Sequence, residues 1–172
     1  RSLIDVMKYR DSWIIAFLYI GTFGSFIGFS FAFDQVLQLN FLAGLTHSGL
    51  TPAQAAAQAS LHAAQIAFIG PLLGSLTRPV GGWLSDRVGG GKITLYAFVA
   101  MIFGAGILVT AGTIDDRAAG APSGTIMSAY VIGFIILFVL SGLGNGSVYK
   151  MIPSIFAAKA HSAGHDETWS RT

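Results

Sequence analysis

The stretch GSLTRPVGGWLSDRVGGGK, residues 74–92, carries two separate groups of charge in an otherwise apolar region. Arg78 stands alone, because the nearest acidic residue along the chain is Asp86, eight positions later. Asp86 and Arg87 form a compact second group, followed by Gly89, two further glycines and Lys92. The composition of the whole chain indicates the environment of both groups.

That composition is typical of an integral membrane protein. Of the 172 residues, 53% are hydrophobic and only 10% are charged, whereas soluble domains carry about 25% charged residues. The 22 glycines and 13 phenylalanines are a mixture more usual in packed membrane helices than in soluble ones. The chain has no cysteine, which excludes disulfides and thiolate chemistry. The net charge of +2 is too small to indicate a nucleic-acid partner.

Four apolar segments each come close to the roughly 20 residues that cross a bilayer. They cover about residues 13–33, 61–84, 93–114 and 126–148. Thr51 and Pro52 resemble an N-cap followed by proline at the first helical position, so the second helix is expected to begin before its apolar part. We therefore predict an all-α membrane protein, with a helical bundle in residues 1–158 and a polar cytoplasmic tail in residues 159–172.

The distribution of lysine and arginine predicts the orientation of the four spans. If the N-terminus is cytoplasmic, seven cations collect on the inner side and only Arg117 on the outer side, while Arg78 and Lys150 stay with the helices. The seven inner cations are Arg1, Lys8, Arg10, Arg87, Lys92, Lys159 and Arg171. Because cytoplasmic loops are enriched in basic residues, both ends of the chain are expected to be cytoplasmic.

Arg78 is the first candidate for a binding residue. It lies about 12 Å from Asp86 along a helix, too deep for easy snorkelling, and a central arginine costs at least about 2.5 kcal/mol on insertion scales. It could pair with a carboxylate on another helix, but the eight acids of the chain all fall at span ends, in connections or in the tail. The alternative is an anionic substrate, which a planar guanidinium can hold through two hydrogen bonds.

Other candidates lie on the first and fourth spans. Tyr19 and Phe23 share one helix face, either as packing residues or as the wall of a cavity that offers a phenol donor and a ring face to a flat anion. Asn145 lies among small residues that allow close helix packing, and its amide could bond across the interface or to a ligand. Lys150 is expected to reach the membrane surface rather than a ligand.

The turn after the second span resembles a known motif. Gly82, Asp86, Arg87 and Gly89 match the G-x-x-x-D-R-x-G motif of the major facilitator superfamily, in which two basic residues follow. Here Gly90 and Gly91 replace that basic pair and the cation comes at Lys92. The resemblance implies that the charges of this cytoplasmic turn hold neighbouring helices together during alternating access.

Three stretches together resemble a narrower group, the nitrate/nitrite porter family. They are YIGTFGSFIGFS (19–30), GPLLGSLTRPVGGWLSDRVGG (70–90) and GLGNGSVYKMIP (142–153), similar to the seventh, eighth and tenth helices of that family. The resemblance implies that Arg78 is one of two arginines that clamp nitrate or nitrite, and that Tyr19 and Phe23 pack against the anion. It also implies that the first six and the last two helices are missing partners of this fragment, and that the complete protein lies in the inner membrane of the cell.

The predicted function is secondary transport of nitrate or nitrite, by exchange or by proton symport, without a cofactor or metal and without enzymatic activity. The absence of acids within the spans favours exchange over proton coupling. Two alternatives stay open: a transporter of another small organic anion, and a structural or quinol-reactive subunit of a membrane enzyme. The lack of paired histidines within the spans counts against the second alternative.

Overall fold

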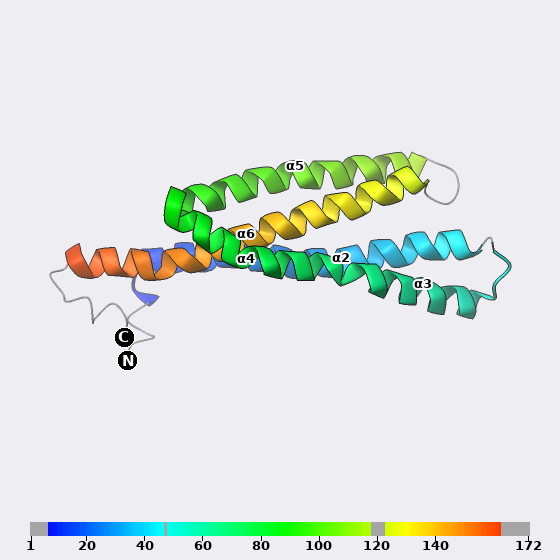
Figure 1. The fold of residues 1–172 in the computed structure, drawn as a ribbon, viewed down its shortest axis with the longest axis horizontal. Coiled ribbons are helices and arrows are strands. Elements are labelled where there is room, and N and C mark those ends of the chain that lie inside the picture. The colour runs from blue at the N-terminus through cyan, green and yellow to red at the C-terminus, as the bar shows by residue number, and fades with distance from the viewer. Residues whose placement is uncertain (1–6, 47, 118–122, 163–172) are drawn as a thin grey trace.

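The computed structural model describes residues 7–46, 48–117 and 123–162, with side chains through Ala158. These residues form long helices that run side by side (Figure 1). The helices are α2 (Arg10–Thr46), α3 (Pro52–Ala67), α4 (Ile69–Val88), α5 (Gly90–Arg117) and α6 (Gly124–Ser162). Within these described residues, four helical stretches are long and apolar enough to span a membrane, with α3 and α4 counted together. The all-α membrane fold with four spans is therefore confirmed.

The helices are longer than the apolar segments that predict them. Helix α2 has 37 residues and α6 has 39, against the 13–33 and 126–148 expected from hydropathy. Hydropathy marks only the apolar part of a helix. Helix α2 contains no proline and continues through Asp34, Gln38 and Asn40 to Thr46, three residues before Gly49 with its positive φ. Helix α6 also includes the first four residues of the predicted tail, and residues 163–172 lie outside the described part of the chain.

Helices α3 and α4 follow one another with a break at Phe68. The start of α3 is a capping box, in which the Thr51 hydroxyl accepts from the Gln54 backbone N–H at 3.4 Å and the Gln54 side chain accepts from the Thr51 N–H at 3.3 Å. The break comes three residues before Pro71, whose ring has no N–H to donate to the preceding turn. Helix α4 continues through Pro79.

The helix ends gather in two groups. The start of α2, the α4–α5 turn and the end of α6 lie at one end of the bundle, on the left of Figure 1, and the α2–α3 connection lies at the other. Gly89 makes the α4–α5 turn with a φ of 100°, a left-handed conformation that glycine adopts without strain. Because the C-terminal ends of α4 and α6 both lie at the end with this turn, the two helices run in the same direction. That the end with the α4–α5 turn is cytoplasmic stays a prediction.

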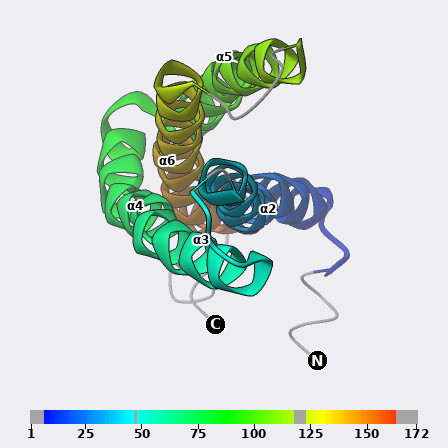
Figure 2. The same ribbon diagram turned by 90° about the vertical axis from the view of Figure 1, so that its right-hand side faces the viewer.

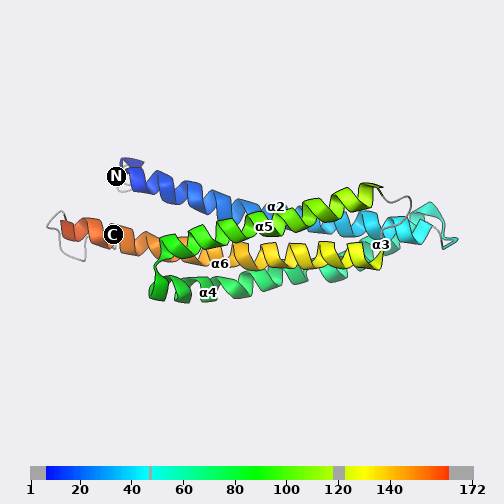
Figure 3. The ribbon, with the colours of Figure 1, turned by 90° about the horizontal axis from the view of Figure 1, so that it is seen from above.

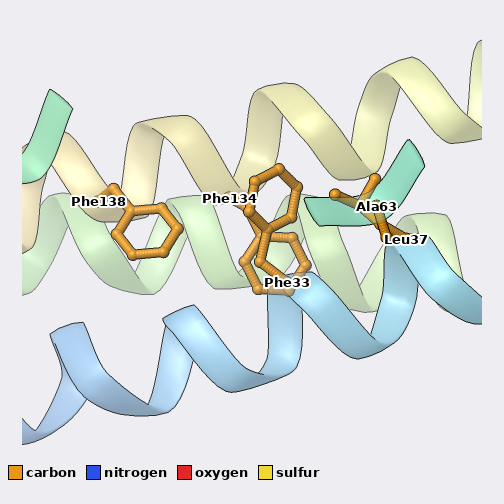
Figure 4. Close-up of a cluster of buried hydrophobic side chains, with 5 residues drawn as sticks. All are labelled: Phe33, Leu37, Ala63, Phe134 and Phe138. Carbon is orange, nitrogen blue, oxygen red and sulfur yellow. The ribbon is translucent and has the colours of Figure 1, made fainter. Parts of the chain in front are cut away.

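Helix α6 is the central element, since it packs against α2, α4 and α5 (Figure 2). A hydrophobic cluster joins it to α2 and α3 (Figure 4), and its buried members are Phe33, Leu37, Ala63, Phe134 and Phe138. The ring centroids of Phe33 and Phe134 are 4.9 Å apart, and those of Phe33 and Phe138 are 6.0 Å apart. These aromatic contacts hold α2 against α6 at the level of the last turn of α3.

Small residues bring the backbones of α4 and α6 into contact between this cluster and the α4–α5 turn. A methyl group added to Gly142 would overlap the carbonyl oxygen of Gly74, and one added to Gly146 would overlap the carbonyl oxygen of Arg78. The Thr77 hydroxyl donates across the same interface to the carbonyl oxygen of Val139 at 3.3 Å. This close approach, typical of small-residue interfaces between membrane helices, fixes Arg78 against α6.

We expect Gly142→Ala to lower the thermal unfolding midpoint of the complete detergent-solubilised protein that contains this segment. The added methyl overpacks the α4–α6 interface, a change that costs about 1–3 kcal/mol. The control is Gly106→Ala on α5, where nothing lies within 4 Å of an added methyl; this variant should unfold at the same or a higher temperature because alanine favours the helix. Equal midpoints for Gly142→Ala and the unmodified protein would contradict the packing described.

Candidate anion-binding site

Arg78 lies on α4 with its guanidinium against two phenylalanine rings of α2. Its Cζ atom is 4.7 Å from the ring centroid of Phe26 and 5.5 Å from that of Phe23. Its Nε is buried and has no hydrogen-bond partner in the structure. Among the described residues no carboxylate is within ion-pair distance of Arg78. The ring faces therefore stabilise the charge of the guanidinium, and no carboxylate of the described residues neutralises it.

Three rings of α2 form a continuous stack beside this guanidinium. Tyr19 and Phe23 have centroids 5.4 Å apart with an interplanar angle of 17°, and Phe23 and Phe26 are 6.4 Å apart at 6°. Phe26 in turn meets Phe138 of α6 edge-on at 5.6 Å. Steps of four and three residues place all three rings on one face of the helix. The stack is anchored at one end by α6 and ends at the Tyr19 phenol.

A cavity of about 640 Å³ opens beside the guanidinium, between α2, α4 and α6. Three of the four predicted binding residues line it: Tyr19, Arg78 and Asn145. The remaining lining residues are Pro79, Gly82, Gly146, Tyr149, Lys150, Ile152 and Pro153. Figure 3 shows α2 diverging from α6 toward the end of the bundle at which this cavity lies. Phe23 is not among the lining residues; its ring packs between Tyr19 and Phe26.

Two interhelical hydrogen bonds set the rotation of α6 around Asn145. The Ser141 hydroxyl donates to the carbonyl oxygen of Thr22 on α2 at 2.7 Å, and the Ser147 hydroxyl lies 2.7 Å from that of Thr94 on α5. Both serines are completely buried. With these neighbours turned toward α2 and α5, Asn145 faces the cavity, where it is only 4% exposed.

The residues of the turn motif lie around the end of α4. Asp86 pairs with Lys150 of α6, with Nζ and Oδ2 3.2 Å apart. The Arg87 guanidinium stacks on the Trp83 ring, 4.1 Å from its centroid, and Lys92 is exposed on α5. The charges of the motif thus form an interhelical ion pair and a local cation–π contact, while Gly82 lines the cavity.

Two residues of the site do not follow from the sequence interpretation. Lys150 lines the cavity, because it lies one helical turn beyond Gly146, where α6 meets α4; that it reaches the membrane surface stays a prediction. Phe26 is the ring nearest to the Arg78 guanidinium. Phe26 comes three residues after Phe23, and this helical spacing could have predicted that both rings lie on the same face of the helix.

A cavity between long apolar helices, with an arginine in its wall that has no carboxylate partner among the described residues, is typical of a segment of a membrane transporter. Over 155 residues, 90% of its length, the chain is 34% identical to the nitrate/nitrite transporter NarU of Salmonella typhimurium. It is 33% identical over 156 residues to the probable nitrate/nitrite antiporter NarK2 of Thermus thermophilus. The nitrite extrusion protein of Bacillus subtilis is 30% identical over 148 residues.

The chain belongs to this nitrate/nitrite transporter family of the major facilitator superfamily. These relatives are transporters and not enzymes. The matched residues cover 28% of the Salmonella protein, 31% of the Thermus protein and 30% of the Bacillus protein, so the chain spans less than a third of the length of its relatives. No protein-family model matches the chain.

We expect Phe26→Leu, introduced into the complete transporter, to raise the nitrate concentration that half-saturates uptake about fivefold. The guanidinium would lose its nearest ring, and one cation–π contact of about 1 kcal/mol corresponds to such a change. Phe31→Leu is the control, since this ring is on the same helix and 70% exposed. Equal shifts in the two variants would show that the ring beneath Arg78 has no special effect on anion affinity.

Proposed function

We propose that the segment supplies one half of the anion site of a transporter that moves nitrate, nitrite or both across the cytoplasmic membrane, with both ends of the segment in the cytoplasm. The observation that carries this proposal is the Arg78 guanidinium, which lines a cavity without a carboxylate partner among the described residues. An intramembrane cation without a counter-ion is stable only if it meets a cavity, a partner or a ligand. A monovalent oxyanion satisfies both its charge and its free donors.

The ring stack explains why the site favours a flat anion. Phe23 and Phe26 occupy positions against the guanidinium and restrict its rotation, so its free edge is presented to the cavity. A planar oxyanion can accept two parallel hydrogen bonds from that edge. Tyr19 is then placed to donate from its phenol, and Asn145 from its amide, into the same cavity. Phe23 acts through the guanidinium and Tyr19, since its ring does not line the cavity.

Transport requires more than this segment. Alternating access depends on two halves that rock around a site near the bilayer midplane, and four spans form only part of one half. The resemblance implies a second arginine in the other half, so the segment alone binds the anion weakly and transports nothing. The missing helices are its obligatory partners.

Exchange of anions is the mode that the cavity supports best. Among the described residues, the cavity is lined by two cations and by no carboxylate, whereas the proton relays of proton-coupled transporters contain acidic side chains. A returning nitrite anion can instead neutralise Arg78 after nitrate has left. The Thermus relative carries the name of an antiporter.

We expect Arg78→Lys in the complete transporter to reduce kcat/KM for nitrate by at least about tenfold, since the ammonium keeps the charge but loses the bidentate fork. The control is Arg117→Lys, the same substitution at an exposed position at the C-terminal end of α5, far from the α4–α5 turn. Uptake of labelled nitrate into vesicles measures both. Nitrite should compete with nitrate in this assay and acetate should not; a near-normal rate in Arg78→Lys would refute the role of Arg78.

We expect nitrite inside the vesicles to accelerate the uptake of labelled nitrate, whereas collapse of the pH gradient should leave the initial rate unchanged. This result follows from a cavity that needs an anion, and not a proton, to balance its charge. The same vesicles loaded with gluconate serve as the control. A rate that falls with the pH gradient and ignores internal nitrite would show proton symport instead.

A further inference from the structure

The cavity contains a second cation at a different depth. Lys150 lines it from α6, four residues beyond Gly146, which is about one helical turn or 6 Å further along the axis. Because Gly146 touches the backbone of Arg78 and the two helices run in the same direction, Lys150 lies nearer than Arg78 to the end that holds the α4–α5 turn. An anion that moves between Arg78 and that end passes Lys150.

The partner of Lys150 is easily exchanged. Its Nζ atom lies 3.2 Å from Oδ2 of Asp86, and the two side chains are 52% and 53% exposed. Exposed ion pairs of this kind contribute little net stability. An anion in the cavity can therefore replace the carboxylate as the partner of the ammonium at small cost.

Arg78 and Lys150 also differ in their chemistry, and the difference suits an anion that stops at one cation and moves past the other. Arginine offers a rigid, planar fork, which suits a fixed position for a bound oxyanion, whereas the lysine ammonium is a point charge on a flexible stem with freely rotating donors. A flexible point charge can follow an anion that is entering or leaving. Asp86 supplies the counter-charge when no anion is present.

We propose that Lys150 is a second anion contact, at the end of the cavity near the α4–α5 turn, and that the transported anion competes with Asp86 for it. Passage of the anion then opens the Asp86–Lys150 pair, which joins α4 to α6. This inference rests on the proposed transport of nitrate or nitrite. It differs from a purely structural role of the ion pair, in which the carboxylate and the ammonium only hold the helices together.

The two roles predict different signs when each partner is removed. As a competitor for Lys150, Asp86 weakens anion binding, so Asp86→Asn should lower the half-saturating nitrate concentration roughly two- to fivefold, the range for one exposed pair. Lys150→Gln should raise it by a similar factor, and Lys150→Arg should keep it near the unmodified value. In the Lys150→Gln background, Asp86→Asn should have no further effect. A structural pair would instead shift both single variants in the same direction.

The experiment uses the complete transporter in vesicles, with uptake normalised to the amount of protein in the membrane. Arg10→Gln is the control for general surface charge, since this exposed arginine at the start of α2 lies at the same end but does not line the cavity; its half-saturating concentration should stay within about twofold. If Lys150→Gln does not reach the membrane, Asp86→Asn alone decides: an unchanged or raised value overturns the proposal. Failure of the proposed function looks different, because then the unmodified protein shows no saturable nitrate uptake.

Discussion

The backbone contact between α4 and α6 is the constraint on which the site depends. Gly142 and Gly146 remove the side chains that would keep the two helices apart, and the Arg78 carbonyl rests directly on Gly146. Helix–helix association in membranes relies on such close van der Waals packing, since lipid supplies no hydrophobic drive. The same contact brings residues of α4 and α6, among them Arg78, Gly82, Asn145 and Lys150, to one cavity. A larger residue at either glycine would separate them.

The rings of α2 contact the Arg78 guanidinium through their faces and do not form an ion pair with it. A carboxylate at this place would neutralise the guanidinium and compete with any anion, whereas ring faces stabilise a cation by their quadrupole and leave its edge free. The buried Nε without a partner shows that this stabilisation is incomplete, and an unsatisfied buried donor costs free energy. Part of that cost is recovered when an acceptor enters. This unsatisfied donor supports the proposal that an anion binds in the cavity.

Much of this arrangement could be predicted from the sequence. Apolar length predicted four spans, the depth of Arg78 predicted a cavity, and the spacing of Tyr19 and Phe23 predicted a shared face. Periodicity describes one helix at a time, however, and it does not say how two helices cross. For this reason two features could not be deduced: the location of Lys150 in the cavity, and the packing of the Phe23 ring between Tyr19 and Phe26 outside the cavity lining. Hydropathy also underestimated α2, because a helix continues through polar residues until its hydrogen bonding is interrupted.

The components of the site belong to two groups of helices with different connections. Arg78, Asn145 and Lys150 sit on α4 and α6, which share the glycine interface, whereas the ring stack belongs to α2. Near Arg78, α2 is joined to that pair by the hydrogen bond from Ser141 to Thr22 and by the contacts of Phe26. A displacement of α2 relative to α4 therefore removes rings from the guanidinium and changes how strongly it needs an anion. By thermodynamic linkage, a bound anion must then also change the preferred position of α2. For the proposed transporter, alternating access needs such a coupling between occupancy and helix position, and a site divided between α2 and the α4–α6 pair would supply it.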